Sequence, residues 1–465
     1  MNKINIRTNT KKILSDTFTP VAIYLKMREI FPRSILLESS DYHSSEDSLS
    51  IICLQPVATI SVLDYQVEES IGDRYQNSFS VKGSFAPVLT GFMEHFLFPP
   101  EQTGLPNGFF GYLGYDAVRY FEDIRLSAPR KQAYAIPDIR YSLYRYVITI
   151  NHFNNTLFIT ENLFDGESSE IDKIEMFIRN MAVSSGKFAL TGDEHSNITD
   201  EDYIRMVTAG KKHCFRGDVF QIVLSRQFRQ GFRGDDFNLY RTLRSVNPSP
   251  YLFYFDYGDY SIFGSSPETH LKINAGRAYI NPIAGTFRRT GNDEEDKQKA
   301  YELTRDEKEN AEHIMLVDLA RNDLSRYGSD VRVEKFQEIQ FYSHVIHMVS
   351  TVSARLHHAA DSVSMLGATF PAGTLTGAPK YKAMELIDGL ENQARGFYGG
   401  AIGYLHPGGD LNHAIMIRSF LSKDNTLFYQ AGAGVVSRSV EENELQEVNN
   451  KLAALKKAML MAQEI

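Results

Sequence analysis

The chain has 465 residues, 43% of them hydrophobic, which is long enough for two large domains with packed cores. Its formal net charge of −9 argues against nucleic acid as a main partner. No apolar run reaches the roughly 18 residues that a membrane-spanning helix needs, and the amino terminus lacks the apolar core of a secretory signal. The two cysteines, Cys53 and Cys214, have no metal-binding or redox spacing, so we expect buried thiols in a reducing cytoplasm.

Residues 1–183 predict an amino-terminal domain of strands and helices. Glycines within its aromatic stretch indicate close approach of two backbones. The predicted elements are a capped helix within 10–31 that starts near Pro20, a buried strand in 33–41, the glycine-rich aromatic stretch 108–122, a hairpin over 138–162 that turns at Asn154-Asn155, and a helix in 169–182.

Residues 184–198 lack periodicity and are rich in small and polar side chains, which predicts a linker. Thr199 then begins a capping box that opens a helix, and residues 199–465 form the second predicted domain. Short strands follow, then a central helix over 306–323, more strands, and a terminal helix. Strands and helices mix without strict βαβ alternation, so we expect an α+β fold with large, mostly antiparallel sheets and helices outside.

Two pairs of glutamates stand out on predicted helices. Glu309 and Glu312 are three residues apart in the central helix, and Glu444 and Glu447 are three apart in the terminal helix. Residues at this spacing share a helix face, so the four carboxylates could hold one Mg²⁺, which prefers oxygen ligands. The alternative is that each pair lies on a solvated helix surface.

Two glycine-rich stretches resemble nucleotide-binding motifs but do not match them. In 371–380, PAGTLTGAPK, the glycine spacing of a P-loop is wrong, and in 431–437, AGAGVVS, a serine replaces the third glycine of a dinucleotide fingerprint. Both stretches instead predict backbone N–H groups exposed in tight turns, which suit a carboxylate ligand.

Three further side chains are candidates for chemistry. Arg418 lies in an apolar strand context and needs an anionic partner, either a bound carboxylate or a protein carboxylate. Glu268 follows a predicted strand in a turn, where catalytic acids are common, although a surface glutamate is the simpler alternative. His344 and His347 are expected on opposite faces of a strand, and either could be a core histidine.

Ten motifs in order closely resemble the chorismate-utilising enzymes, and within them the anthranilate synthase component I family. The resemblance covers nearly the whole chain and is densest from about residue 200 to 455. The motifs are GDVFQIVLSRQF, NPSPYLFYF, GSSPE, NPIAGTFRRT, DEKENAEHIMLVDLARND, SHVIHMVS, PAGTLTGAPK, GFYGGAIGYL, AIMIRSF and AGAGVVSRSVEENELQEVNNK.

The resemblance implies roles for these residues. Glu312 and Glu447 match the ligands of a Mg²⁺ ion that binds the ring carboxylate of chorismate. Glu309 and Glu444 would hold waters of that ion, and Glu309 is also among the matched catalytic residues. Glu268 matches the general acid that protonates the departing C4 hydroxyl, and His347 the histidine that assists the loss of pyruvate. The matched substrate-binding residues are Gly285, Thr286, Tyr398, Arg418, Gly432, Ala433, Gly434 and Lys451.

Two positions separate members of this family. Ala284 stands where aminodeoxychorismate synthases carry a nucleophilic lysine, and Gln221 stands where isochorismate and salicylate synthases carry a lysine that activates water. Both positions therefore favour anthranilate synthase, with ammonia as the acceptor. The ammonia would come from a separate glutamine amidotransferase subunit, because neither cysteine lies in an amidotransferase motif.

The resemblance also implies feedback inhibition by L-tryptophan. Two segments, 36–40 and 247–251, match the family's effector site. The residues expected to line it are Glu38, Ser39, Pro250, Tyr251 and Leu252, the last replacing a methionine that is frequent in the family. Alternatively, these segments are merely a core strand and a turn.

Three alternatives to an anthranilate synthase remain. Aminodeoxychorismate synthase component I would retain the enolpyruvyl group in its product. A tryptophan-binding regulator would bind without turnover, although intact Glu268, Glu312 and Glu447 argue against it. A di-iron helical bundle needs Glu-x-x-His motifs, whereas His313 directly follows Glu312.

Overall fold

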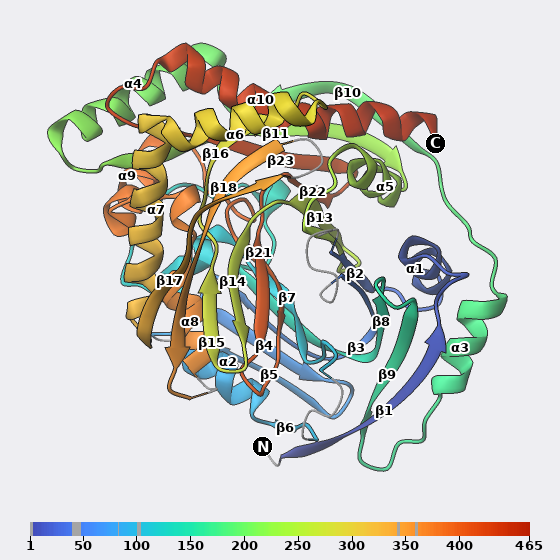
Figure 1. Cartoon of the computed structure of the whole chain (residues 1–465). Helices are drawn as coiled ribbons and strands as arrows, with labels where there is room; N and C mark the ends of the chain where they lie inside the picture. Colours follow the sequence, from blue (N-terminus) through green and yellow to red (C-terminus); the bar gives the residue numbers. More distant parts are fainter. Residues whose placement is uncertain (1–2, 40–47, 82, 100–103, 342–344, 359–360) are drawn as a thin grey trace.

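A computed structural model describes residues 3–39, 48–81, 83–99, 104–341, 345–358 and 361–465; His344 and Ser40 lie outside them. The fold is α+β, as predicted, and every strand pairing in these ranges is antiparallel except that of β1 with β6. Helices lie on the outside of the strands (Figure 1). No helix in these ranges is both long and apolar enough to cross a bilayer.

The amino-terminal part contains the predicted elements in order, together with a first strand and a helix at 86–93 that were not predicted from the sequence. Thr19 caps the first helix by accepting a hydrogen bond from the Ala22 N–H, and the hairpin turns at Asn154-Asn155. Its elements are β1 (Ile4–Leu14), α1 (Pro20–Arg28), β2 (Ile35–Glu38), β3 (Leu49–Leu63), β4 (Gln66–Ile71), β5 (Tyr75–Ser80), α2 (Ala86–Met93), β6 (Phe96–Leu97), β7 (Phe109–Leu113), η1 (Tyr115–Tyr120), η2 (Gln132–Tyr134), β8 (Ile139–Asn151), β9 (Thr156–Phe164) and α3 (Ile171–Asn180).

The carboxy-terminal part begins with a strand and the predicted capped helix, in which Thr199 and Asp202 form a complete capping box. Its first elements are β10 (Phe188–Ser196), α4 (Asp200–Arg216), β11 (Gln221–Gly234), α5 (Phe237–Val246), β12 (Tyr251–Asp256), β13 (Tyr260–Ser266), β14 (Thr269–Asn274), β15 (Arg277–Ile280), β16 (Ile283–Arg288), α6 (Asp293–Arg305) and α7 (Glu307–Ser325). The others are β17 (Gly328–Phe341), β18 (Val345–Leu356), α8 (Asp361–Thr369), η3 (Gly373–Leu375), β19 (Gly377–Ala378), α9 (Lys380–Leu390), β20 (Ala401–Leu405), β21 (Leu411–Ile415), β22 (Ser419–Lys423), β23 (Thr426–Val435), α10 (Glu441–Met461) and η4 (Ala462–Glu464).

Strand pairing runs across both parts of the chain. Strand β2 pairs with β3 on one side and with β12 on the other, where Leu252 lies opposite Glu38. Strand β7 likewise pairs with both β8 and β20. The two parts therefore share hydrogen-bonded sheet.

Four sequence expectations need correction. Residues 188–196 of the predicted linker form β10, which pairs with β11, because strand pairing does not require an apolar pattern at an exposed edge. Gly432–Gly434 lie within β23, opposite β11, and not in a turn. Arg418 lies between β21 and β22 with a φ of 49°, and not within a strand. Cys53 is buried, but Cys214 is partly exposed.

A close backbone approach at Gly111 confirms the expectation for the aromatic stretch. A Cβ atom added to Gly111 would lie 1.9 Å from the carbonyl oxygen of Arg140 on the neighbouring strand β8. The paired backbones would therefore have to separate to admit any side chain.

We expect Gly111→Ala to destabilise the protein by about 3 kcal/mol, because the added methyl group overpacks this strand pair. Urea unfolding measures the change. Gly91→Ala is the matched control: nothing lies within 4 Å of its Cβ position in α2. Alanine should stabilise that helix by up to about 1 kcal/mol. Equal midpoints for the two variants would contradict the close approach.

Candidate functional site

Glu268 lies in the turn between β13 and β14. Its Oε1 accepts a 2.8 Å hydrogen bond from the Thr374 hydroxyl, and its carbonyl accepts one of 3.0 Å from the Ile415 N–H. Burial raises the pKa of Glu268 to about 7, opposed by Thr374 and by the charges of Lys451 and Arg418. The carboxyl group is therefore substantially protonated near neutral pH and can act as an acid.

Arg418 places a cation beside this acid. Its side chain hydrogen bonds to Asn247 Oδ1 at 3.5 Å, and its carbonyl accepts from the Ser265 N–H at 3.1 Å. Among the described residues, no carboxylate lies within ion-pair distance of its guanidinium. Burial lowers the pKa of Arg418, while Glu268 opposes that shift. An anionic ligand would compensate this buried charge.

His347 on β18 lies beside the bulge at Gly285 on β16. The His347 Nδ1 lies 3.3 Å from the Gly285 carbonyl oxygen, so Nδ1–H donates and the other ring nitrogen can accept a proton. Burial lowers the pKa of His347 to about 4, and Arg418 adds to the lowering. A Cβ added to Gly285, which has a φ of 71°, would lie 3.2 Å from Glu309 Oε2. Glu309 is therefore close to this bulge.

The glutamates of α7 and α10 are connected through β11 and β23. The Gln221 amide donates to Glu312 Oε1 at 3.2 Å, and a Cβ on Gly434 would meet that same amide at 2.5 Å. Two strand positions away, the Gly432 carbonyl accepts from Lys451 at 2.9 Å, and Lys451 forms a 2.7 Å ion pair with Glu447. Glu312, through Gln221, and Glu447, through Lys451, therefore lie near positions of β23 that are two residues apart.

Tyr398 and Glu444 complete this group. The Tyr398 hydroxyl accepts from the Gly432 backbone, and burial raises its pKa. Glu444 is buried on α10, one helical turn before Glu447. Ala433 lies in β23 opposite Leu224. Gly285 and Thr286 lie on β16, where Thr286 pairs with His347; the side chains of Thr286 and Ala284 are outside what the structure describes.

Three residues in the surroundings of this site were not singled out from the sequence. Thr374 was part of a motif considered for its backbone, yet its hydroxyl holds Glu268. Arg395, 2% exposed, forms an ion pair of 2.6 Å with Glu391 and donates to the Val223 and Leu375 carbonyls, at 2.7 Å each. Glu391 and Arg395 are four residues apart with the acid first, and this spacing is the signal in the sequence that could have indicated the ion pair.

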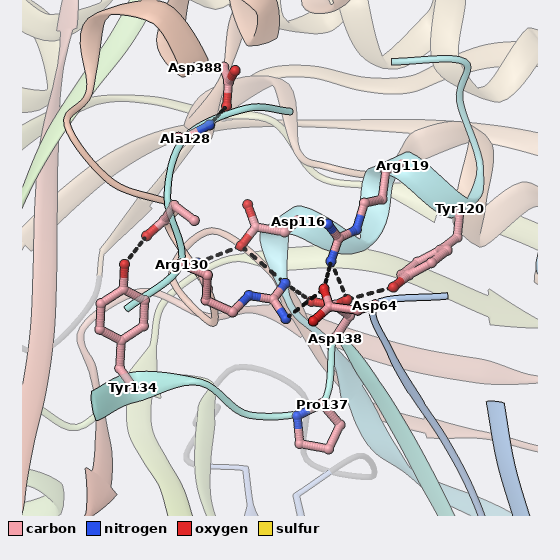
Figure 2. A network of polar contacts seen from close by, with 12 residues as sticks. Asp64, Asp116, Arg119, Tyr120, Ala128, Arg130, Tyr134, Pro137, Asp138 and Asp388 are labelled. Carbon is pink, nitrogen blue, oxygen red and sulfur yellow. Dashed lines mark hydrogen bonds and ion pairs between the residues drawn. The ribbon is translucent and has the colours of Figure 1, made fainter. Parts of the chain in front are cut away.

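A polar network adjoins the Arg395–Glu391 ion pair through the residues next to Arg395 in the chain. The Gly396 N–H donates to Asp116, and Tyr134 donates to the Ala394 carbonyl. Figure 2 shows how Asp138 gathers contacts from Arg119, Tyr120 and Arg130, while Asp388 accepts from the Ala128 backbone. The segment that leads to Tyr398 is thereby anchored to the amino-terminal part of the chain.

The predicted effector residues lie elsewhere, along a cavity of about 920 Å³. Glu38, Ser39, Pro250, Tyr251 and Leu252 all line it. Glu38 also accepts hydrogen bonds from Tyr240 at 2.6 Å and Arg244 at 2.9 Å. The cavity therefore joins the two segments that the sequence singled out, at the boundary between the two parts of the chain.

A family model for chorismate binding enzymes matches residues 40–457. The chain belongs to the chorismate-binding enzyme family. Anthranilate synthase component 1 of Aquifex aeolicus is 37% identical over 97% of this chain and 94% of its own length, and that of Thermus thermophilus is 36% identical over 98% and 99%.

Solved structures agree with this membership. Anthranilate synthase component I from Streptococcus pneumoniae has a TM-score of 0.78 and 32% identity, over 96% of this chain and all of the other. The menaquinone-specific isochorismate synthase of Escherichia coli has a TM-score of 0.75 at 18% identity, over 99% and 96%. The second likeness shows a shared fold.

The raised pKa of Glu268 makes stability depend on pH. Its folded value, about 7, exceeds the ordinary 4.5, so its stabilising contribution is present below 4.5 and lost as pH rises through 7. Glu268→Gln has no titrating group at this position and so avoids this loss. We expect the free energy of unfolding of the variant, relative to that of the wild type, to rise by up to about 3 kcal/mol between pH 4.5 and pH 8. Thermal unfolding at both pH values measures it. Glu442→Gln, exposed on α10, should show no such gain; a gain equal to that of Glu268→Gln would contradict the shifted pKa.

Proposed function

We propose that this chain is the large subunit of an anthranilate synthase, which converts chorismate and ammonia to anthranilate and pyruvate in the cytoplasm. The observation that carries the proposal is Glu268, an acid with a pKa near 7, beside the cations Arg418 and Lys451. A dianionic substrate with a poor leaving group needs this combination. The names of the relatives support the same reaction.

Each residue then has a defined task. Arg418 binds the enolpyruvyl carboxylate, and Tyr398 and the β23 backbone orient the rest of the substrate. Ammonia attacks C2 of the ring while Glu268 gives its proton to the C4 hydroxyl, which leaves as water. In the second step neutral His347 takes the C2 proton, the bond between C3 and the enolpyruvyl oxygen breaks, and the ring becomes aromatic. The departing enolate gains a proton and is released as pyruvate.

The carboxylates on α7 and α10 fit Mg²⁺ as a donor set. Within the described ranges, no three His, Cys, Asp or Glu side chains are grouped to hold a metal ion by themselves. Mg²⁺ commonly uses one or two carboxylates and completes its shell with substrate oxygens and waters. Glu312 and Glu447 would bind the ion, with Glu309 and Glu444 holding waters. When bound, it neutralises the ring carboxylate and makes C2 more electrophilic.

Gln221 and Ala284 support ammonia as the nucleophile. The Gln221 amide donates to Glu312, and an amide has no basic nitrogen with which to activate water. Alanine at 284 supplies no amine. A separate glutamine amidotransferase subunit would deliver ammonia. Aminodeoxychorismate synthase component I is the alternative within the family, and its product would retain the enolpyruvyl group.

The cavity of about 920 Å³ is the proposed site of L-tryptophan feedback. Glu38 carries the charge that suits an α-ammonium group, and apolar Pro250 and Leu252 suit an indole ring. A tryptophan-binding regulator without activity would have the same cavity but would leave the acid and cations at the other site without a role.

The decisive test is an incubation of the purified chain with chorismate, Mg²⁺ and ammonium. We expect equal amounts of anthranilate, seen by fluorescence, and pyruvate, with inhibition by added L-tryptophan. EDTA or Glu447→Ala should lower the rate at least ~1000-fold, because several kcal/mol of charge stabilisation are lost. Glu442→Ala, exposed on the same helix, is the control and should keep the rate. Chorismate consumed without anthranilate would refute the proposal.

Gln221→Lys tests the part that Gln221 has in the choice of ammonia as the nucleophile. A lysine there would replace the amide hydrogen bond to Glu312 by an ion pair and compete with the metal. We expect anthranilate formation to fall at least ~10-fold and half-saturating Mg²⁺ to rise. Gln227→Lys, on the same strand but bonded to Gln393, should leave the Mg²⁺ requirement unchanged. An unaltered Mg²⁺ requirement in Gln221→Lys would count against the position of Gln221.

A further inference from the structure

A small inner cavity of about 40 Å³ borders Glu268. Residues of the turn before β14, of α7, of α8 and of η3 form its walls. Neither Arg418 nor Lys451 lines it, and among the described residues no other arginine or lysine does. The inner cavity is therefore separate from the cations beside Glu268, and the proposed reaction leaves it without a role.

The inner cavity has the size and the chemistry to hold water. Its polar lining residues are Glu268, Thr269, His270, Asp323, Thr369 and Thr374. A cavity needs about 10–15 Å³ to hold one water molecule, which needs roughly two to four polar partners. The inner cavity meets both conditions, although apolar residues such as Leu316 and Leu319 form the rest of its wall. Ordered water can therefore lie beside the Glu268 carboxyl group.

A mostly buried ion pair adjoins the inner cavity. The Asp323 carboxylate accepts a 2.6 Å hydrogen bond from Lys380, which also donates to the Thr369 carbonyl at 2.8 Å. The Asp323 and Lys380 side chains are 9% and 12% exposed, so Asp323 contacts both solvent and the cavity. Burial raises the pKa of Asp323, opposed by Lys380 and Arg326. Asp323 and Lys380 end two of the family motifs, yet the proposed mechanism gives neither a task.

His270 is less suited than Asp323 to carry a proton here. Burial lowers the pKa of His270 to about 3, and the charge of Lys380 adds to the lowering. Its Nε2 lies 3.3 Å from the Thr369 hydroxyl. The ring is therefore neutral at the pH of the reaction. Apart from Glu268, Asp323 is then the titratable residue of the described cavity wall that can take up and release a proton.

Glu268 must regain a proton after every turnover. In the proposed reaction it gives its proton to the departing C4 hydroxyl and becomes a carboxylate. The ammonium group formed on C2 releases one proton to solvent, so the reaction consumes none overall, and solvent can return one to Glu268. On the substrate side the charges of Lys451 and Arg418 act on Glu268 and repel a hydronium ion. The inner cavity offers a path that no arginine or lysine of the described chain lines.

We propose that water in the inner cavity returns the proton to Glu268, and that Asp323 is the residue through which this proton enters. This inference rests on the proposed function. A proton from solvent binds a carboxylate oxygen of Asp323 and passes from there to the cavity water. The water gives one of its own protons to the Glu268 carboxylate. Asp323 and the water are thereby restored, and only O–H bonds form and break. Lys380 holds Asp323 against the cavity.

The test uses two variants that block the path at different places. Asp323→Asn removes the group that takes up the proton, and Ala320→Val adds two methyl groups to the cavity wall and displaces the water. Near pH 6, below its pKa of about 7, Glu268 is mostly protonated at the start. Rapid mixing with chorismate, Mg²⁺ and ammonium should therefore give a first turnover at the wild-type rate. Later turnovers should be at least ~10-fold slower, which appears as a burst approaching one anthranilate per active site.

Two readouts separate a blocked proton path from general damage to the site. The kcat/KM for chorismate should stay within ~2-fold of the wild-type value, because the proton returns after the products have formed. General damage would slow the first turnover as well. Asp318→Asn, exposed on α7 in an ion pair with Arg321, is the control and should keep the wild-type kcat without a new burst. A crystal structure of the wild type should show ordered water in the inner cavity, and one of Ala320→Val should lack it.

The outcomes distinguish the two proposals. Unchanged kcat in both variants, or a first turnover as slow as the later ones, would overturn the proton path and leave the proposed function intact. An inner cavity without ordered water in the wild-type crystal would also overturn it. A burst with Ala320→Val and none with folded Asp323→Asn would overturn the role of Asp323; if Asp323→Asn does not fold, Ala320→Val decides. Absence of anthranilate with the wild type would overturn the proposed function, and the path with it.

Discussion

The buried ion pair of Arg395 and Glu391 is the constraint on which the catalytic side depends. Arg395 donates to carbonyls on β11 and η3, and Glu391 accepts from both the N–H and the hydroxyl of Ser225. Breaking a buried ion pair leaves one charge buried without a partner, which typically costs about 3–5 kcal/mol. The contacts of this pair are therefore maintained together. The pair thereby fixes β11, which begins at Gln221, relative to η3, which contains Thr374.

Tyr398 is connected both to this ion pair and to the large cavity of about 920 Å³. The Arg395 guanidinium lies 5.8 Å from the centre of the Tyr398 ring, and the Gly396 N–H is held by Asp116 of the amino-terminal part. The same segment continues into β20, where Tyr404 lines the large cavity. Tyr398 and the wall of the large cavity thus share continuous backbone.

The sequence predicted local structure well wherever local chemistry decides it. The Thr199 capping box and the Asn154-Asn155 hairpin turn need only neighbours along the chain. It failed at β10, whose exposed, polar residues form a strand because β11 offers an unpaired edge, and at Gly432–Gly434, where glycine permits close strand approach and not a turn. The resemblance indicated the site residues, but the Thr374–Glu268 bond joins residues 106 positions apart, which no local pattern reveals.

The catalytic side retains features that oppose stability. Glu268 has its pKa raised by burial, and Arg418 is buried in a left-handed backbone conformation that costs of order 1–3 kcal/mol in non-glycine residues. Neither is compensated by an ion pair in the described part of the chain. In the proposed reaction an anionic substrate would supply the missing charge for Arg418, and protonated Glu268 beside it would be the acid that is consumed. On that proposal, the unfavourable terms of the folded chain are those that substrate binding and proton transfer would relieve.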